Sequence, residues 1–66
     1  MTESDETSLL KILQESLLPG QGGIKIRAFL AFNRGNALVS LENLEQLKAK
    51  GLIDIHDDTV FPLDLL

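Results

Sequence analysis

The chain has 66 residues, one histidine, no cysteine, tryptophan or tyrosine, and a formal net charge of −4. That length allows one small domain with a single hydrophobic core. The composition excludes disulfides and a cysteine-histidine zinc site, so aliphatic packing or a partner subunit must stabilise the fold.

The N-terminal part is acidic, and residues 1–6 are predicted to be an acidic tail ahead of a single domain over residues 7–66. Leucines then recur at helical spacing, which predicts an amphipathic helix from Thr7 to Leu18. Pro19 and Gly20 end this helix. Three residues are candidate N-caps for it: Asp5, Thr7 and Ser8.

The apolar run within that helix also bears on location. Charged and polar residues interrupt it, and the residues before it are acidic rather than basic. The sequence therefore predicts neither a signal peptide nor a membrane span, and we expect a cytoplasmic protein without a membrane partner.

Residues 24–33 combine the alternation of a strand with the apolar spacing of a helix. We predict a short extended segment over residues 24–26, followed by a helix over about residues 27–33. Gly35 or Asn36 is expected to close this helix in a left-handed conformation, because such residues commonly follow the last helical turn.

The segment from Ser40 to Lys50 has the clearest helical pattern, with three leucines on one stripe. Ser40 is the expected N-cap. If Gly51 adopts a left-handed conformation after the last turn, Leu52 should pack on Leu47, which is the hydrophobic contact of a Schellman motif.

Residues 52–66 are predicted to form a β-hairpin with a loop over residues 57–59, which pairs Ile55 with Phe61. Pro62 cannot donate a backbone hydrogen bond, so its strand should lie at an edge. The expected register places five apolar side chains on one face: Ile53, Ile55, Phe61, Leu63 and Leu65.

The predicted order of elements resembles the winged-helix class of helix-turn-helix proteins. The pattern Leu-x-x-Leu-x-x-Lys-Gly-Leu-Ile within residues 39–53 resembles a recognition helix that leads into a wing. The resemblance implies an α+β fold: a small winged-helix-like domain with three helices and a C-terminal β-hairpin. It would make Ser40 to Lys50 the recognition helix and residues 57–59 the wing tip. Asp57 and Asp58 depart from the family, whose DNA-binding members usually carry Lys or Arg there.

Charge is uneven along the chain, with a net charge of +3 over residues 19–52 and negative segments on either side. Under the DNA-binding alternative, two amides would read bases and three cations would hold phosphates. These candidates are Arg34, Asn43, Gln46, Lys48 and Lys50. Glu42, Glu45 and the acidic tip oppose such binding, because carboxylates beside phosphates reduce the counterion-release contribution.

The sequence does not indicate an enzyme, a cofactor or a metal site. His56 lies among aspartates, which we interpret as a solvated turn. Neither a nucleophile with its base nor a phosphate-binding glycine loop accompanies it.

Fourteen of the residues are leucine, and the first helix carries a wider apolar arc than a small core can cover. We therefore expect a small acidic protein-protein interaction module, an adaptor or regulator that binds a protein partner or itself as a homodimer. The predicted partner-binding residues are Leu10, Leu17 and Leu18. Two alternatives stay open: a DNA-binding transcriptional regulator of winged-helix type, and an acidic inhibitor that mimics nucleic acid.

Overall fold

The computed structural model describes residues 1–63, which form three helices and three short strands. The strands form one antiparallel sheet, and the last two make a C-terminal hairpin, so the predicted α+β class is confirmed. In chain order the elements are α1 (Glu3–Ser16), β1 (Ile24–Lys25), α2 (Ile26–Phe32), α3 (Leu41–Ala49), β2 (Ile53–His56) and β3 (Thr59–Pro62).

α1 begins at Glu3, so the expected start at Thr7 is wrong, and residues 3–6 form its first turn. The reason is a capping box. The Thr2 hydroxyl accepts a hydrogen bond from the Asp5 N–H at 3.1 Å, and the Asp5 carboxylate accepts one from the Thr2 N–H at 3.2 Å. At its other end the helix stops at Ser16 rather than Leu18, because Leu17 is already extended, with ψ of 138°.

The ambiguous middle segment divides as predicted into a short strand and a helix. β1 leads directly into α2, with Lys25 as the residue at the junction. Gly35 has φ of +92°, which confirms a left-handed glycine soon after α2.

Both ends of α3 follow from its sequence. The Ser40 hydroxyl accepts a hydrogen bond from the Asn43 N–H at 3.2 Å. Beyond the last turn, Gly51 has φ of +77° and Leu52 donates to the Leu47 carbonyl at 3.1 Å. These bonds confirm the N-cap and the Schellman motif.

The hairpin differs from its predicted register. Its turn contains two residues, Asp57 and Asp58, both left-handed with φ of 52° and 58°. Ile55 consequently pairs with Val60, so the expected pairing with Phe61 is wrong. A two-residue turn with both φ values positive matches the right-handed twist of the flanking strands and is a common hairpin connection. The predicted face also included Leu65, which lies outside the described residues.

The expectation that Pro62 lies on an edge strand is also wrong, because the strand order is β1-β3-β2 and β3 is central. Leu63 donates its N–H to the Leu52 carbonyl at 3.2 Å. Since backbone groups alternate in direction along a strand, the Pro62 nitrogen points away from β2. β1 pairs only with Thr59 and Val60, so no ladder hydrogen bond is lost at the proline.

Phe61 lies on the sheet face opposite Val60 and covers Gly23. A Cβ atom on Gly23 would lie 2.6 Å from a carbon of the Phe61 ring and 2.7 Å from the Val60 carbonyl oxygen. The missing side chain of this glycine therefore allows the loop before β1 to approach the hairpin.

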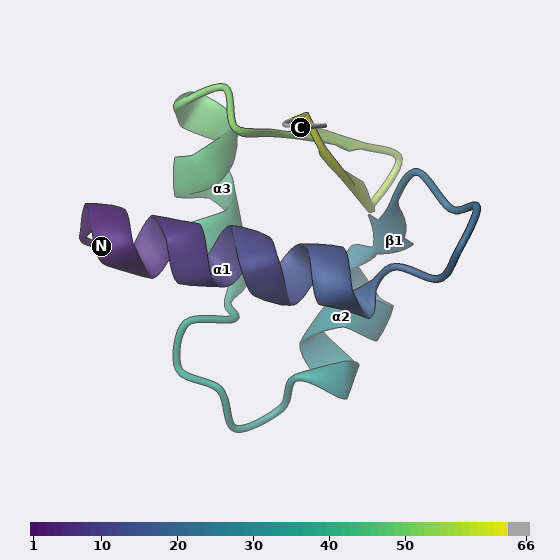
Figure 1. Cartoon of the computed structure of the whole chain (residues 1–66), viewed down its shortest axis with the longest axis horizontal. Helices are drawn as coiled ribbons and strands as arrows, with labels where there is room; N and C mark the ends of the chain where they lie inside the picture. Colours follow the sequence, from purple (N-terminus) through teal and green to yellow (C-terminus); the bar gives the residue numbers. More distant parts are fainter. Residues whose placement is uncertain (64–66) are drawn as a thin grey trace.

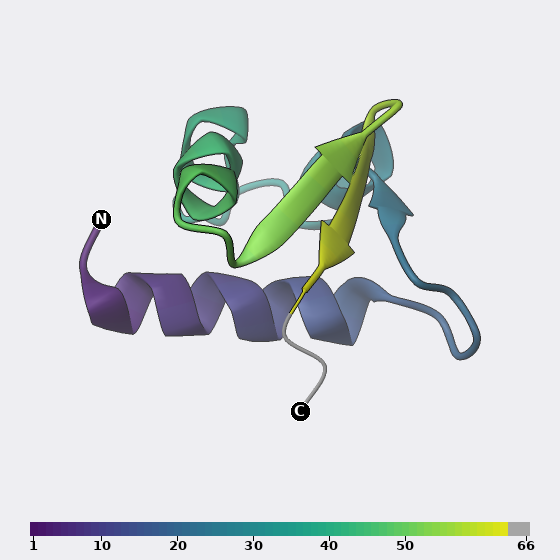
Figure 2. The same cartoon turned by 90° about the horizontal axis from the view of Figure 1, so that it is seen from above.

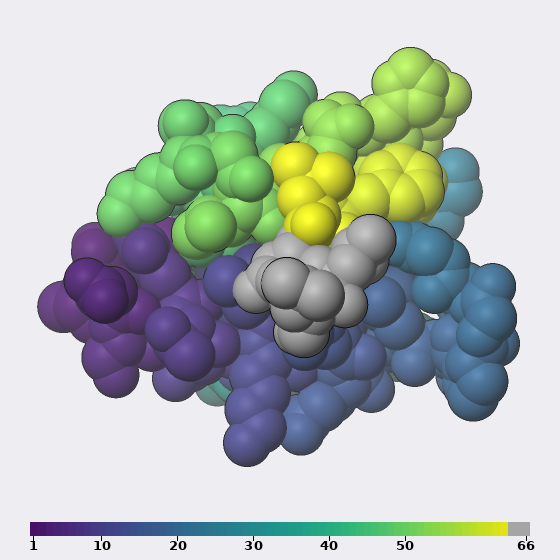
Figure 3. All heavy atoms as spheres, turned by 45° about the horizontal axis from the view of Figure 1, so that its top comes forward, coloured from purple at the N-terminus to yellow at the C-terminus, as the bar shows by residue number. Residues whose placement is uncertain are grey.

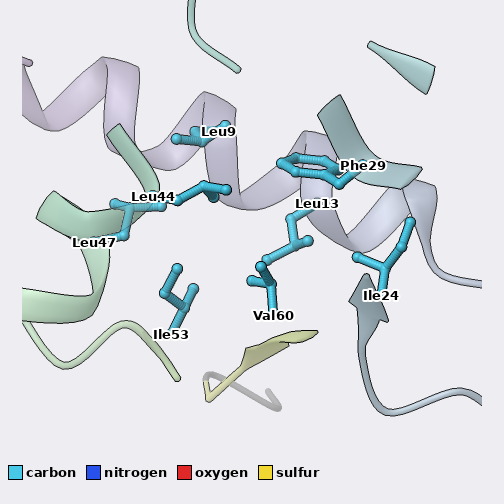
Figure 4. Packing of buried hydrophobic residues seen from close by; sticks show 8 residues of the cluster. All are labelled: Leu9, Leu13, Ile24, Phe29, Leu44, Leu47, Ile53 and Val60. Carbon is cyan, nitrogen blue, oxygen red and sulfur yellow. The ribbon is translucent and has the colours of Figure 1, made fainter. Parts of the chain in front are cut away.

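Every element contributes to one hydrophobic core. α3 lies against the N-terminal half of α1, and α2 lies near its C-terminal end (Figures 1 and 2). The core side chains converge between the helices and the sheet (Figure 4). They are Leu9, Leu13, Ile24, Phe29, Leu44, Leu47, Ile53 and Val60.

Candidate functional site

The outward face of α3 is acidic. Leu44 and Leu47 point into the core, and the helical periodicity then places Glu42, Glu45 and Gln46 on the opposite side, where all three are exposed. A recognition helix with two carboxylates on this face would repel phosphates. The structure therefore exposes Glu42 and Glu45 on α3, where they would oppose the binding of a phosphate backbone, as the sequence predicted.

Two of the five nucleic-acid candidates make contacts within the domain. Asn43 is half-buried, and its side-chain amide donates to the Leu38 carbonyl at 2.9 Å, which ties α3 to the loop before it. Lys50 forms an ion pair with Glu6, whose side chain is 9% exposed. These contacts anchor α3 to the rest of the domain.

The other three candidates are exposed, and one of them, Arg34, does not lie on α3 with the rest. Arg34 follows α2, which lies near the C-terminal end of α1, whereas Gln46 and Lys48 lie on α3, against the N-terminal half of α1 (Figure 1). The structure thus separates the cations that the sequence placed in a single basic segment.

A hollow of about 460 Å³ with mainly apolar walls opens where α1 ends. Its walls come from α1, the loop over residues 17–23, β1 and α2, and this loop projects beyond the end of α1 (Figures 2 and 3). Leu18 and Phe32 line it, and 64% and 74% of their surfaces are exposed. The remaining lining residues are Ser16, Gln21, Gly23, Ile24, Lys25, Ala28 and Thr59.

The three predicted partner-binding leucines differ in their exposure to solvent. Leu18 lies in the wall of the hollow and is exposed. Leu10 and Leu17 are half-buried and pack against the core. The leucine-rich helix is thus largely covered by its own domain, and of the three only Leu18 presents most of its surface.

Sequence reasoning missed Phe32, which is the most exposed large apolar residue among residues 1–63. A signal was present, because Ala28 and Phe32 recur at helical spacing along α2, and both line the hollow together with Lys25 of β1.

One of the residues that line the hollow is a cation. Lys25 lines it, and its ammonium group donates to the Asp57 carbonyl at 3.3 Å. Arg27 is exposed in the first turn of α2, and Asp58 lies with both of them around a second depression. Within residues 1–63 neither cation forms an ion pair with a carboxylate.

The histidine cluster is exposed at the hairpin tip. His56 Nε2 and an Asp57 carboxylate oxygen lie 3.3 Å apart, and about three quarters or more of each side chain is exposed. In the described part of the chain, no group of three acidic or histidine side chains is placed to hold a metal ion. Nor does any helix there have the length and apolar character needed to cross a membrane.

Comparison with known proteins gives no relative. No family model matches the chain, and neither curated proteins nor solved structures yield a significant match.

Proposed function

We propose that this protein is a non-enzymatic protein-interaction module, a cytoplasmic adaptor or regulator with winged-helix-like topology. The order of helices and strands, with the hairpin after the third helix, supports that topology. The observation that carries the function is the hollow beside α1, because large exposed apolar side chains around a concavity are typical of protein contact sites.

The charges on α3 favour protein over DNA as the partner. Glu42 and Glu45 face outward, and the side chains of Asn43 and Lys50 have partners inside the domain. Reading bases would require breaking those contacts while two carboxylates approach the phosphates. Both costs oppose DNA binding, whereas a protein partner at the hollow incurs neither.

The proposal is tested by pull-down from the native host combined with titration of labelled duplex DNA at low and moderate salt. We expect a protein that is retained by the natural chain and lost with Phe32→Ser, and no retardation of DNA. Leu41→Ser is the matched control, because Leu41 is exposed on α3, away from the hollow.

Three results would contradict the proposal. Salt-sensitive retardation of duplex DNA would support the transcriptional regulator instead. Competition with DNA for a basic protein would support the nucleic-acid mimic. A monomeric molar mass in solution together with no retained protein would remove the reason for an interaction module.

A further inference from the structure

We infer that the free edge of β1 binds an extended, uncharged segment of a partner protein, which adds a strand to the sheet and places one apolar side chain in the hollow. The inference rests on the proposed function and names the conformation and chemistry of the partner. Its supports are the backbone groups of β1, the blocked opposite edge of the sheet, and the walls of the hollow.

β1 directs two backbone groups away from the sheet. The Ile26 N–H donates to the Asp58 carbonyl at 2.8 Å, at the end of the β1–β3 ladder. Because backbone groups alternate in direction along a strand, the Lys25 N–H and the Gly23 carbonyl point away from β3. β1 is the outer strand, so this side lies at an edge of the sheet (Figure 2). A donor and an acceptor are thus in place for an added strand.

The opposite edge of the sheet, formed by β2, is blocked by a side chain of its own. Leu52 accepts a hydrogen bond from Leu63, so alternation directs the backbone of Ile55 outward. The Ile55 N–H donates to the Asp54 carboxylate at 2.9 Å. A charged side chain at an outward N–H is one way in which edge strands avoid further pairing.

The charged side chain of β1 leaves its edge open. The Lys25 ammonium group reaches toward the hairpin, where it donates to the Asp57 carbonyl at 3.3 Å. It therefore does not cover the Gly23 carbonyl side of the strand, and β1 is the edge that remains available to a partner.

The hollow lies beside this edge and suits one apolar side chain. Gly23 and Lys25 line it together with Leu18 and Phe32. A volume of about 460 Å³ holds a leucine or phenylalanine side chain with room for the adjoining backbone. An inserted side chain would shield Leu18 and Phe32 from water. In strand addition, main-chain hydrogen bonds supply affinity and a pocket for alternate side chains supplies specificity.

The charges around the hollow favour an uncharged segment. Of the described residues that line it, only Lys25 is ionisable, and Asp58 lies with Lys25 around the second depression. A carboxylate on the partner would approach Asp58, whereas a cation would meet Lys25 and find no carboxylate in the walls. Because a buried charge without a partner is costly, both signs are disfavoured.

A second copy of the chain suits this edge less well than a separate partner. Pairing of two β1 edges about a twofold axis at Ile24 would place the two Lys25 side chains on one face as diagonal neighbours. Two ammonium groups in such positions repel each other.

The test begins with selection from a random peptide display library against the full chain, followed by affinity measurements on the enriched peptides. We expect uncharged peptides with an essential Leu, Ile, Val or Phe, whose affinity changes less than about twofold between low and high salt. Methylation of the peptide N–H that pairs with Gly23 should weaken binding about tenfold, and methylation of the adjacent N–H much less, because pairing uses every second residue.

Lys25→Pro tests the same pairing on the protein. Lys25 has φ of −60°, which proline adopts, and its N–H points away from β3, so the domain should keep its fold. Lys25→Ala is the matched control, because it removes the same side chain and keeps the N–H. We expect Lys25→Pro to bind the peptides at least about tenfold more weakly than Lys25→Ala.

A second pair of variants tests the hollow. Phe32→Ser should weaken peptide binding at least about tenfold, whereas Leu41→Ser, on α3, should change it less than about twofold. Circular dichroism and urea denaturation check that all four variants are folded, and the methylated peptides test the pairing on the natural chain.

Four outcomes would overturn the inference. Equal binding by Lys25→Pro and Lys25→Ala, or equal effects of methylation at adjacent positions, would show that the partner does not pair with β1. Enrichment of charged peptides alone, or a dimer that Lys25→Pro dissociates, would assign the edge to another occupant. The absence of any enriched peptide would contradict it as well. In each case the interaction function stands if the pull-down still loses the host protein with Phe32→Ser, so the two proposals fail separately.

Discussion

Glu6 is buried in the fold although its sequence context predicts an exposed side chain. Its neighbours suggest a solvated acidic tail, yet the residue is 7% exposed and pairs with Lys50, far along the chain. The pair joins the first turn of α1 to the end of α3. A charged group in this position is tolerated because an opposite charge contacts it.

Replacing Lys50 by alanine should therefore destabilise the domain. The Glu6 carboxylate would lose its partner, and we expect the free energy of unfolding to fall by about 1–2 kcal/mol, below the cost for a fully buried pair. The Lys50 side chain is 55% exposed, so water screens part of the interaction. Urea denaturation measures the change.

Lys48→Ala is the matched control, because Lys48 is exposed on the same turn and should shift stability by less than about 0.5 kcal/mol. The double variant Glu6→Gln with Lys50→Ala should recover part of the loss. Equal effects of the two lysine substitutions would show that the ion pair does not stabilise the fold.

Among the elements, the hairpin shows how a turn overrides apolar patterning. Phe61 is the larger side chain, yet Val60 occupies the core and Phe61 covers Gly23. The two-residue turn determines which side chains face inward, because a shift of one residue exchanges the faces of a strand. Two consecutive left-handed aspartates form this turn where Asn-Gly is the usual choice.

The turn predicts that Asp58→Gly stabilises the protein. Glycine adopts φ of about +58° without the steric cost that an L-residue carries, and the contact from Ile26 uses the backbone carbonyl, which the substitution keeps. We expect a gain of about 0.5–1 kcal/mol in the free energy of unfolding, measured by thermal or urea denaturation.

Asp58→Ala serves as the comparison, because alanine loses the side chain without gaining left-handed freedom. It should leave stability unchanged or lower it. Should alanine stabilise as much as glycine, the gain would come from removing a carboxylate at the acidic tip and not from the backbone.

The helices were predicted more accurately than the sheet, because the signals that specify a helix lie close together in the sequence. Ser40, Gly51 and the leucines between them lie within a few residues of one another and specify α3 at both ends. The capping box of α1 is equally local, but the acidic pattern of residues 1–6 obscured it. β1 has two residues and is paired only through β3, so its place in the sheet depends on the tertiary fold.

Within residues 1–63 the molecule has a core of eight buried apolar residues, and consequently each core contact is a large share of the stability. Packing against this core distinguishes two adjacent leucines. Leu17 is half-buried and packs against the core, whereas Leu18 is 64% exposed. The boundary between core and contact surface falls between them.

We expect Leu17→Glu to destabilise the domain by about 2 kcal/mol or more, because the carboxylate would replace apolar packing. Leu18→Glu should change stability by less than about 0.5 kcal/mol while it reduces partner capture. Thermal denaturation and the pull-down, carried out on both variants, measure the two effects. If Leu18→Glu unfolds the domain, Leu18 belongs to the core and not to the contact surface around the hollow.

The fold class, the three helices, the caps of α3 and the acidic tip could be predicted from the amino-acid sequence, because each depends on neighbouring residues or on the order of local elements. The register of the hairpin, the central position of β3, the burial of Glu6 and the exposure of Phe32 became evident from the folded chain. These features depend on contacts between residues distant in the chain. A local pattern specifies which face of an element is apolar, but the packing of the other elements decides how much of that face remains open to a partner.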